Sequence, residues 1–232
     1  MRPPAAAAFV CVVLAVTGLS SFFAFSPQHS GSPAFWIWAA GPTVALSAIA
    51  AAWAWREGLL KEWLSPQWGD FTRGLAGAAV LFGAAWGFAR VVAPVGSARE
   101  IWLVSLYGQI GDPRTLQGHA PMVAAGVAVT ALAEEVLWRG AMTELVASRV
   151  GSRTAWLWTA GLYALAHAPA AWSLRGVSGA ASLNPVLAIA ALGLGLVCGG
   201  MARAFGRLAP GVLAHALFDW AVVMMFPLWG ER

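Results

Sequence analysis

Apolar stretches of about the length that crosses a bilayer recur along most of this chain. Hydrophobic residues make up 59% of the 232 residues, charged residues make up 10%, and the mean hydropathy is +0.70. A soluble domain carries roughly 25% charged residues. The sequence therefore predicts an all-α, polytopic membrane helix bundle that forms a single domain over 1–232.

We expect about seven transmembrane helices, because seven stretches are close to 20 apolar residues long. They are Ala5–Phe25, Phe35–Trp55, Gly74–Val95, Pro121–Ala147, Thr154–Trp172, Pro185–Phe205 and Pro210–Trp229. Ile101–Ile110 is too short to cross and is expected at the interface or as a re-entrant helix, although counting it would give eight spans. Arg56–Arg73, which contains Trp63, Trp68 and Phe71, is expected to be an interfacial amphipathic segment.

The distribution of basic residues predicts the orientation in the membrane. With a cytoplasmic N-terminus, the inner loops would hold Arg2, Arg56, Lys61, Arg73, Arg149, Arg153, Arg203 and Arg207, and the outer loops Arg99, Arg114 and Arg175. We therefore attribute the net charge of +4 to basic residues that orient the protein in the membrane, and nucleic acid is not an expected partner. Ala5–Phe25 is long for a signal peptide and another span follows it, so we expect a retained helix. The chain has one lysine and many Ala and Gly residues, a composition typical of GC-rich bacterial genomes, so we expect a bacterial inner-membrane protein. The sequence does not indicate its oligomeric state.

Two adjacent glutamates lie within the apolar stretch 122–146, where ionisable side chains are costly and usually mark function. Glu135 and Arg139 are four residues apart, with the acid first, which is the favourable order for an ion pair on a helix. Glu134 points roughly 100° away from Glu135. We therefore expect Arg139 to neutralise Glu135 and leave Glu134 free to act as a general base. A purely structural ion pair is the alternative.

Two histidines lie in later apolar stretches. His167 is near the middle of its stretch, with Tyr163 one turn before it on the same helix face. His215 and Asp219 form another pair with a spacing of four, so Asp219 is placed to orient His215 or to hold its protonated ring. A satisfied core histidine and a helix-stabilising pair are the structural alternatives for these two groups. Carboxylates and histidines on separate spans together predict buried hydrolytic chemistry.

These residues resemble three motifs of the CPBP family of intramembrane endopeptidases, the CAAX-protease and bacteriocin-processing family. Glu134-Glu135-Val-Leu-Trp-Arg139 resembles its EExxxR motif, and Tyr163-Ala-Leu-Ala-His167 its FxxxH motif with Tyr for Phe. His215-Ala-Leu-Phe-Asp219 resembles its HxxxN or HxxxD motif. The resemblance covers about 122–229, which implies catalytic core spans over 121–229 after variable N-terminal spans over 1–120.

The resemblance implies a role for each residue and a peptide or protein substrate presented in or at the membrane. Glu134 would activate the attacking water, and His167 would help to bind it. His215 and Asp219 would stabilise the oxyanion, while Glu135 and Arg139 would hold the geometry, with Tyr163 as a supporting aromatic ring. An ionised Asp cannot donate a hydrogen bond as Asn does, so Asp219 must act through His215 or be protonated.

The sequence is also compatible with other cofactors and functions. No cofactor is expected, although zinc held by Glu134, His167 and His215 is an alternative. Gly176-Val-Ser178-Gly179 matches the GxSG of rhomboid proteases, but an ordinary turn is the favoured interpretation. A proton-coupled transporter would also need buried acids and histidines, although no repeated halves are evident. A non-catalytic scaffold or immunity-type protein is the last alternative.

Overall fold

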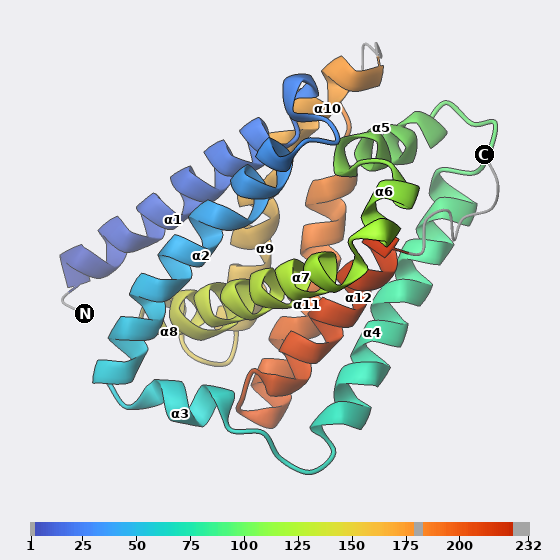
Figure 1. The fold of residues 1–232 in the computed structure, drawn as a ribbon. Coiled ribbons are helices and arrows are strands. Elements are labelled where there is room, and N and C mark those ends of the chain that lie inside the picture. Colours follow the sequence, from blue (N-terminus) through green and yellow to red (C-terminus); the bar gives the residue numbers. More distant parts are fainter. Residues whose placement is uncertain (1–2, 179–182, 225–232) are drawn as a thin grey trace.

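The computed structural model describes residues 3–178 and 183–224. All regular elements in these ranges are helical, and they form a bundle with a short helix at either end (Figure 1). The α-helices are α1 (Pro3–Ala24), α2 (Pro33–Arg56), α3 (Leu59–Leu64), α4 (Asp70–Gly87), α5 (Glu100–Ile110), α6 (Pro113–Gly118), α7 (Ala120–Glu134), α8 (Thr143–Val150), α9 (Ala155–His167), α10 (Ala170–Ser178), α11 (Val186–Phe205) and α12 (Ala209–Met224). The expected all-α membrane bundle is therefore confirmed.

Five helical segments in the described residues are long and apolar enough to cross a membrane. They are Pro4–Ala24, Pro33–Arg56, Asp70–Val92, Ala120–Val150 and Val186–Phe205. The chain is thus an integral membrane protein. The other two predicted spans look different in the structure. Thr154–Trp172 is divided between α9 and α10, and the last apolar helix has 16 residues, Ala209–Met224, with 225–229 of that predicted span outside the described residues.

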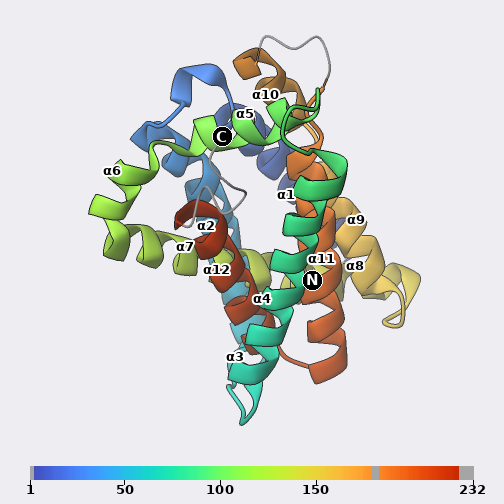
Figure 2. The same cartoon turned by 90° about the vertical axis from the view of Figure 1, so that its right-hand side faces the viewer.

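The helices pack in pairs that bring distant parts of the sequence together. α9 lies against α11, α12 against α4, and α1 against α2, while α7 crosses the bundle in contact with both α2 and α12. Figure 2 shows α4 and α12 side by side, as their contacts require. Glycines permit these close approaches: a Cβ at Gly195 would lie 3.0 Å from Ala160, and one at Gly74 2.8 Å from the Leu213 side chain.

The segment 56–73 contributes to the core as well as to the surface. α3 is only six residues long, and its Trp63 is buried against the backbone at Gly140, where an added Cβ would lie 2.6 Å from the indole ring. Trp68 and Phe71 are exposed, as an interfacial segment requires. Trp63 therefore departs from the expected interfacial position, because glycine at 140 leaves a recess that an indole fills.

A buried ion pair closes the end of the bundle near α3. Arg207, in the turn between α11 and α12, donates from Nε and Nη2 to the Asp70 carboxylate at the start of α4. Arg73 reaches the same carboxylate at 3.3 Å and stacks on the Phe205 ring. The backbone N–H of Leu208 donates to Trp63 O. These contacts fix the beginning of α12, the helix that carries His215.

The short helix α5 lies at the opposite end of the bundle. It packs on α10 and α11, and it is too short to cross a bilayer (Figure 1). Asn184 Nδ2 donates to Trp102 O, and Ser30 Oγ donates to Gly108 O, so hydrogen bonds hold both ends of α5. This position agrees with the expectation that 101–110 does not span.

Candidate active site

A change of helix type positions the two glutamates. α7 ends at Glu134, a π-helix runs from Glu135 to Met142, and α8 follows without a break. The Thr143 hydroxyl donates to Trp138 O, five residues back, which marks the wider turn. The continuous helix has 31 residues, about 46 Å at 1.5 Å per residue, so it exceeds the ~30 Å hydrocarbon core. π-Helical turns occur frequently at functional sites.

Glu135 points into the protein and is fully buried. Its Oε1 lies 3.2 Å from Arg139 Nη1 and 2.9 Å from His215 Nδ1. The predicted pairing of Glu135 with Arg139 is confirmed, and the contact with His215 of α12 adds a second partner. Glu135 therefore links the π-helix to α12. Removing a partner from a buried ion pair costs several kcal/mol, so these contacts stabilise the packing of the two helices.

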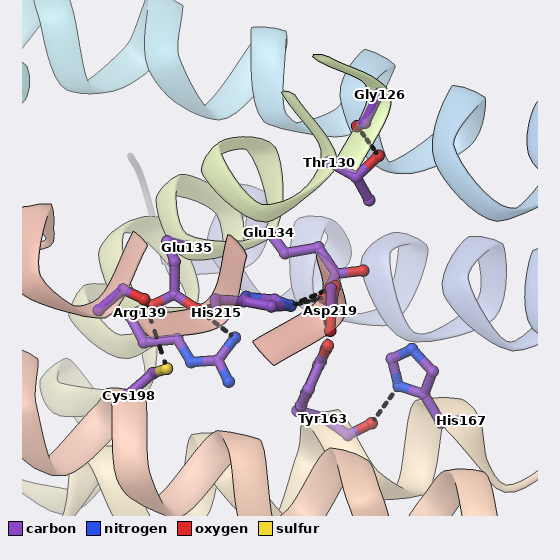
Figure 3. Close-up of polar contacts among 11 residues, drawn as sticks. Gly126, Thr130, Glu134, Glu135, Arg139, Tyr163, His167, Cys198, His215 and Asp219 are labelled. Carbon is purple, nitrogen blue, oxygen red and sulfur yellow. Dashed lines mark hydrogen bonds and ion pairs between the residues drawn. The ribbon is translucent and has the colours of Figure 1, made fainter. Parts of the chain in front are cut away.

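Glu134 points to a different side, as the helical geometry predicts. Its Oε2 accepts a very short hydrogen bond from the Tyr163 hydroxyl and lies 3.8 Å from His215 Nε2. Arg139 is paired with Glu135, so Glu134 has no arginine in contact with its carboxylate among the described residues. Figure 3 shows the two glutamates leaving adjacent positions of the helix in different directions. Glu134 is thus the carboxylate available to a reactant.

His215 lies between carboxylates on both sides of its ring. Nδ1 faces Glu135, while Nε2 lies 3.2 Å from Asp219 Oδ2 and 3.8 Å from Glu134 Oε2. A neutral imidazole has one N–H and an imidazolium has two. Good hydrogen bonds at both nitrogens therefore require either a protonated ring or a protonated carboxyl group. The predicted pairing of His215 with Asp219 is confirmed.

Tyr163 joins the elements of the site through its ring as well as its hydroxyl. The ring lies 4.5 Å from that of His167 and 5.0 Å from that of Trp138, and the guanidinium of Arg139 stacks over it at 4.6 Å. His167 Nδ1 is 2.8 Å from Tyr163 O, which fixes one side of the imidazole. His167 contacts neither glutamate directly within the described residues. It contacts Tyr163, which is bonded to Glu134, and it lines the same cavity as Glu134.

A cavity of about 420 Å³ connects the candidate residues. Most of its wall is apolar and comes from α1, α2, α4, α5, α7, α11 and α12. The ionisable side chains on its wall are Tyr107, Glu134, Tyr163, His167, His215 and Asp219. Glu135 and Arg139 do not line it. The cavity wall thus includes Glu134 and His167 but not Glu135.

The zinc alternative receives no support from the side-chain positions. In the part of the chain that the structure describes, no three His, Cys, Asp or Glu side chains are gathered closely enough to hold a metal ion. Glu134, His167 and His215 line one cavity but do not form such a group.

Two contributors near Glu135 have no distinct signal in the sequence. Cys198 of α11 is buried, and its thiol donates to Gly211 O at 3.7 Å. A Cβ at Gly211 would lie 3.1 Å from Glu135 Oε2, so glycine is needed for α12 to approach the carboxylate. The Tyr163 hydroxyl, which contacts Glu134, is a third contributor that was not predicted.

The first three residues of the GxSG match, Gly176 to Ser178, are the last residues of α10. Its Gly179 lies outside the described residues.

Comparison with known proteins agrees with the motifs. Residues 116–221 match the model of the Rce1-like family, described as type II CAAX prenyl endopeptidase Rce1-like. Searches of the curated proteins and of the solved structures gave no significant match. All seven candidate residues lie within the matched range.

Proposed function

We propose, from the match of residues 116–221 to the Rce1-like family model, that the chain hydrolyses a membrane-presented peptide or protein with a water activated by Glu134. The single observation that carries the proposal is the separation of the two glutamates. Glu134 lines the cavity, whereas Glu135 is turned away from it and paired with Arg139 and His215.

In the proposed reaction, Glu134 takes a proton from water as the oxygen attacks the scissile carbonyl carbon. The C–O bond forms, the carbonyl becomes an oxyanion, and the proton on Glu134 then passes to the leaving amine as the C–N bond breaks. General base catalysis of this kind contributes about 10²–10⁴-fold. The apolar wall of the cavity supports the proposal, because exclusion of bulk water strengthens electrostatic interactions with the transition state.

The other side chains have supporting roles in this scheme. His215, with Nε2 facing the cavity side, would donate to the oxyanion, and Asp219 would act through His215. His167 would bind the attacking water, with its other ring nitrogen fixed by Tyr163 O. Glu135 and Arg139 would hold α12 against the π-helix. The reaction needs no metal ion or other cofactor.

We propose a location in a bacterial inner membrane, with the N-terminus in the cytoplasm. The basis is the charge asymmetry between loops, since Arg56, Lys61, Arg203 and Arg207 flank turns on the proposed cytoplasmic side. Bacterial substrates would be peptides undergoing maturation, bacteriocin-related proteins, or proteins with C-terminal sorting tails.

The test compares protein termini in host cells that carry equal amounts of the wild-type protein, the Glu134→Gln variant or the Glu144→Gln variant. Glu144 is exposed on α8 of the same long helix, so its substitution makes a matched charge change away from the cavity. We expect a set of new termini in wild-type and Glu144→Gln cells that is absent from Glu134→Gln cells. If the termini are identical in all cells and the Glu134→Gln variant still confers the phenotype of the wild-type protein on the host, the scaffold alternative is favoured. If the termini are identical but Glu134→Gln cells lose that phenotype, transport is favoured.

A further inference from the structure

The wall of the cavity formed by α1 and α2 carries two threonines whose hydroxyl groups make no hydrogen bond with the described residues. Thr17 of α1 is 4% exposed, and its Oγ1 is a buried atom without a hydrogen-bond partner. Thr43 of α2 is 3% exposed, but its hydroxyl oxygen is not among the fully buried unpaired atoms. Both residues line the cavity. An unpaired buried hydroxyl is costly, so that of Thr17 points to a missing ligand, and Thr43 adds a second hydroxyl group at the same cavity.

Several hydroxyl groups in α1, α7 and α9 are satisfied by the backbone. Ser20 Oγ donates to Thr17 O, Thr130 Oγ1 to Gly126 O, and Thr159 Oγ1 to Ala155 O, each three or four residues back. This back-bonding is the usual arrangement for Ser and Thr inside a helix. Thr17 and Thr43 therefore differ from these three residues.

The packing of α1 on α2 brings the two threonines to the same depth. The rings of Phe25 and Phe35 are 5.3 Å apart, which sets the register of these antiparallel helices. Thr17 lies eight residues before Phe25, and Thr43 lies eight residues after Phe35. At 1.5 Å per residue, each is about 12 Å from the aromatic pair along its own helix. The two threonines therefore lie at one level of a mostly apolar wall.

That level lies beside the end of α9 that carries His167. Ser21 Oγ lies 3.3 Å from Ala166 O as a donor, and a Cβ at Gly18 would be 3.7 Å from the same oxygen. Thr17 is adjacent to Gly18 and one turn from Ser21. Figure 3 shows α1 and α2 passing behind and above Glu134 and His167. The threonines thus border the part of the cavity in which the proposed reaction takes place.

We infer that Thr17 and Thr43 bind the main chain of the substrate peptide and hold it in the cavity beside Glu134 and His167. This inference rests on the proposed endopeptidase function. A peptide inside an apolar cavity must find partners for its N–H and C=O groups. A hydroxyl can donate to a carbonyl or accept from an amide, so two hydroxyls serve a main chain of any sequence.

The charges on the cavity wall favour a neutral main chain over an anionic group. No lysine or arginine of the described residues lines the cavity, so a carboxylate or phosphate would meet Glu134 and Asp219 without a cation from these residues. The cavity is also far larger than one water, whose share of liquid volume is about 30 Å³. The threonines are positioning residues in this account, since they touch the substrate away from the bond that breaks.

The test uses the purified full-length protein in vesicles of phosphatidylethanolamine and phosphatidylglycerol. The probe is a fluorogenic peptide that carries the cleavage site found by comparison of termini and is blocked at both ends. Thr17→Val and Thr43→Val remove the hydroxyls at nearly constant shape, and Thr17→Ser and Thr43→Ser retain them. Thr159→Val is the matched control, because Thr159 is a buried helical threonine outside the cavity.

We expect each valine variant to raise KM by about threefold to tenfold with kcat little changed, because a lost neutral hydrogen bond affects substrate and transition state alike. The serine variants should restore KM, and Thr159→Val should match the wild type. A probe with one ester in place of an amide at the contacted position should weaken wild-type binding but not that of the double valine variant.

Two results would overturn the inference. If the valine variants keep the wild-type KM while Glu134→Gln abolishes cleavage, the endopeptidase function stands and the threonines do not bind substrate. If KM rises but serine fails to restore it and the ester has equal effects on both proteins, the threonines have a packing role only. Cleavage that is the same in wild-type and Glu134→Gln protein would instead contradict the proposed function itself.

Discussion

The hydroxyl of Tyr163 on α9 donates a hydrogen bond to Oε2 of Glu134, while the Tyr163 ring lies under the guanidinium of Arg139. One side chain therefore touches both the cavity-facing acid and the cation that pairs with its neighbour. The FxxxH motif that this segment resembles has Phe at this position, so the ring agrees with the motif and the hydroxyl is a departure from it.

Tyr163→Phe is expected to preserve cleavage within about tenfold, because it removes one hydrogen bond and keeps the ring contacts. Tyr163→Ala should lower stability by roughly 3–5 kcal/mol, as large aromatic truncations in cores do. Initial cleavage rates in vesicles and thermal unfolding in detergent measure the two effects. Equal loss of activity in both variants, with Tyr163→Phe still folded, would show that the hydroxyl is essential.

Asp219→Asn converts one form of the third family motif into the other. Its amide oxygen can still accept from His215, and its NH₂ group can donate to an oxyanion. We expect kcat/KM of Asp219→Asn to stay within about tenfold of the wild type, the effect of about one hydrogen bond, and that of Asp219→Ala to fall further. An Asp219→Asn protein as inactive as Glu134→Gln would contradict the view that Asp219 acts through His215.

The adjacent glutamates should differ sharply in their effect on stability. Glu135→Gln leaves the buried Arg139 without its carboxylate, and breaking a buried ion pair in this way costs about 3–5 kcal/mol. Glu134 has no arginine partner among the described residues, and glutamine keeps an acceptor for the Tyr163 hydroxyl, so Glu134→Gln should change stability by less than about 1 kcal/mol. Thermal unfolding of both variants in the same detergent checks this. A larger loss in Glu134→Gln would reverse the assignment of the two acids.

Much of the candidate site could be predicted from the sequence, because its strongest contacts lie within single helices. Glu135–Arg139, Tyr163–His167 and His215–Asp219 all have a spacing of four, and each pair meets in the structure. The different directions of Glu134 and Glu135 also follow from helical geometry. The π-helix over Glu135–Met142 was not predicted, since nothing local in the sequence marks the wider turn.

Contacts between helices could not be predicted in the same way. His215 meets Glu135 because Gly211 lets α12 approach the π-helix, and Trp63 enters the core because Gly140 leaves a recess. Such fits depend on two surfaces far apart in the sequence. The number of spans was also difficult to predict, because hydropathy does not indicate that Thr154–Trp172 divides between α9 and α10.

Metal removal should leave the enzyme active. The proposed reaction uses a carboxylate as the base, and no metal-binding group of three side chains is found in the described residues. Dialysis against 1,10-phenanthroline should therefore leave the cleavage rate unchanged, and elemental analysis of the active protein should find far less than one zinc per chain. Loss of activity that returns with added zinc would instead support the Glu134, His167 and His215 alternative.

Single-turnover cleavage with purified protein in vesicles measures whether Glu134 is the base that activates water. We expect Glu134→Gln to lower the rate by at least about 100-fold, the lower end of general base catalysis, with the unfolding temperature unchanged and Glu144→Gln at the wild-type rate. A folded Glu134→Gln protein that cleaves at the wild-type rate would contradict this role of Glu134.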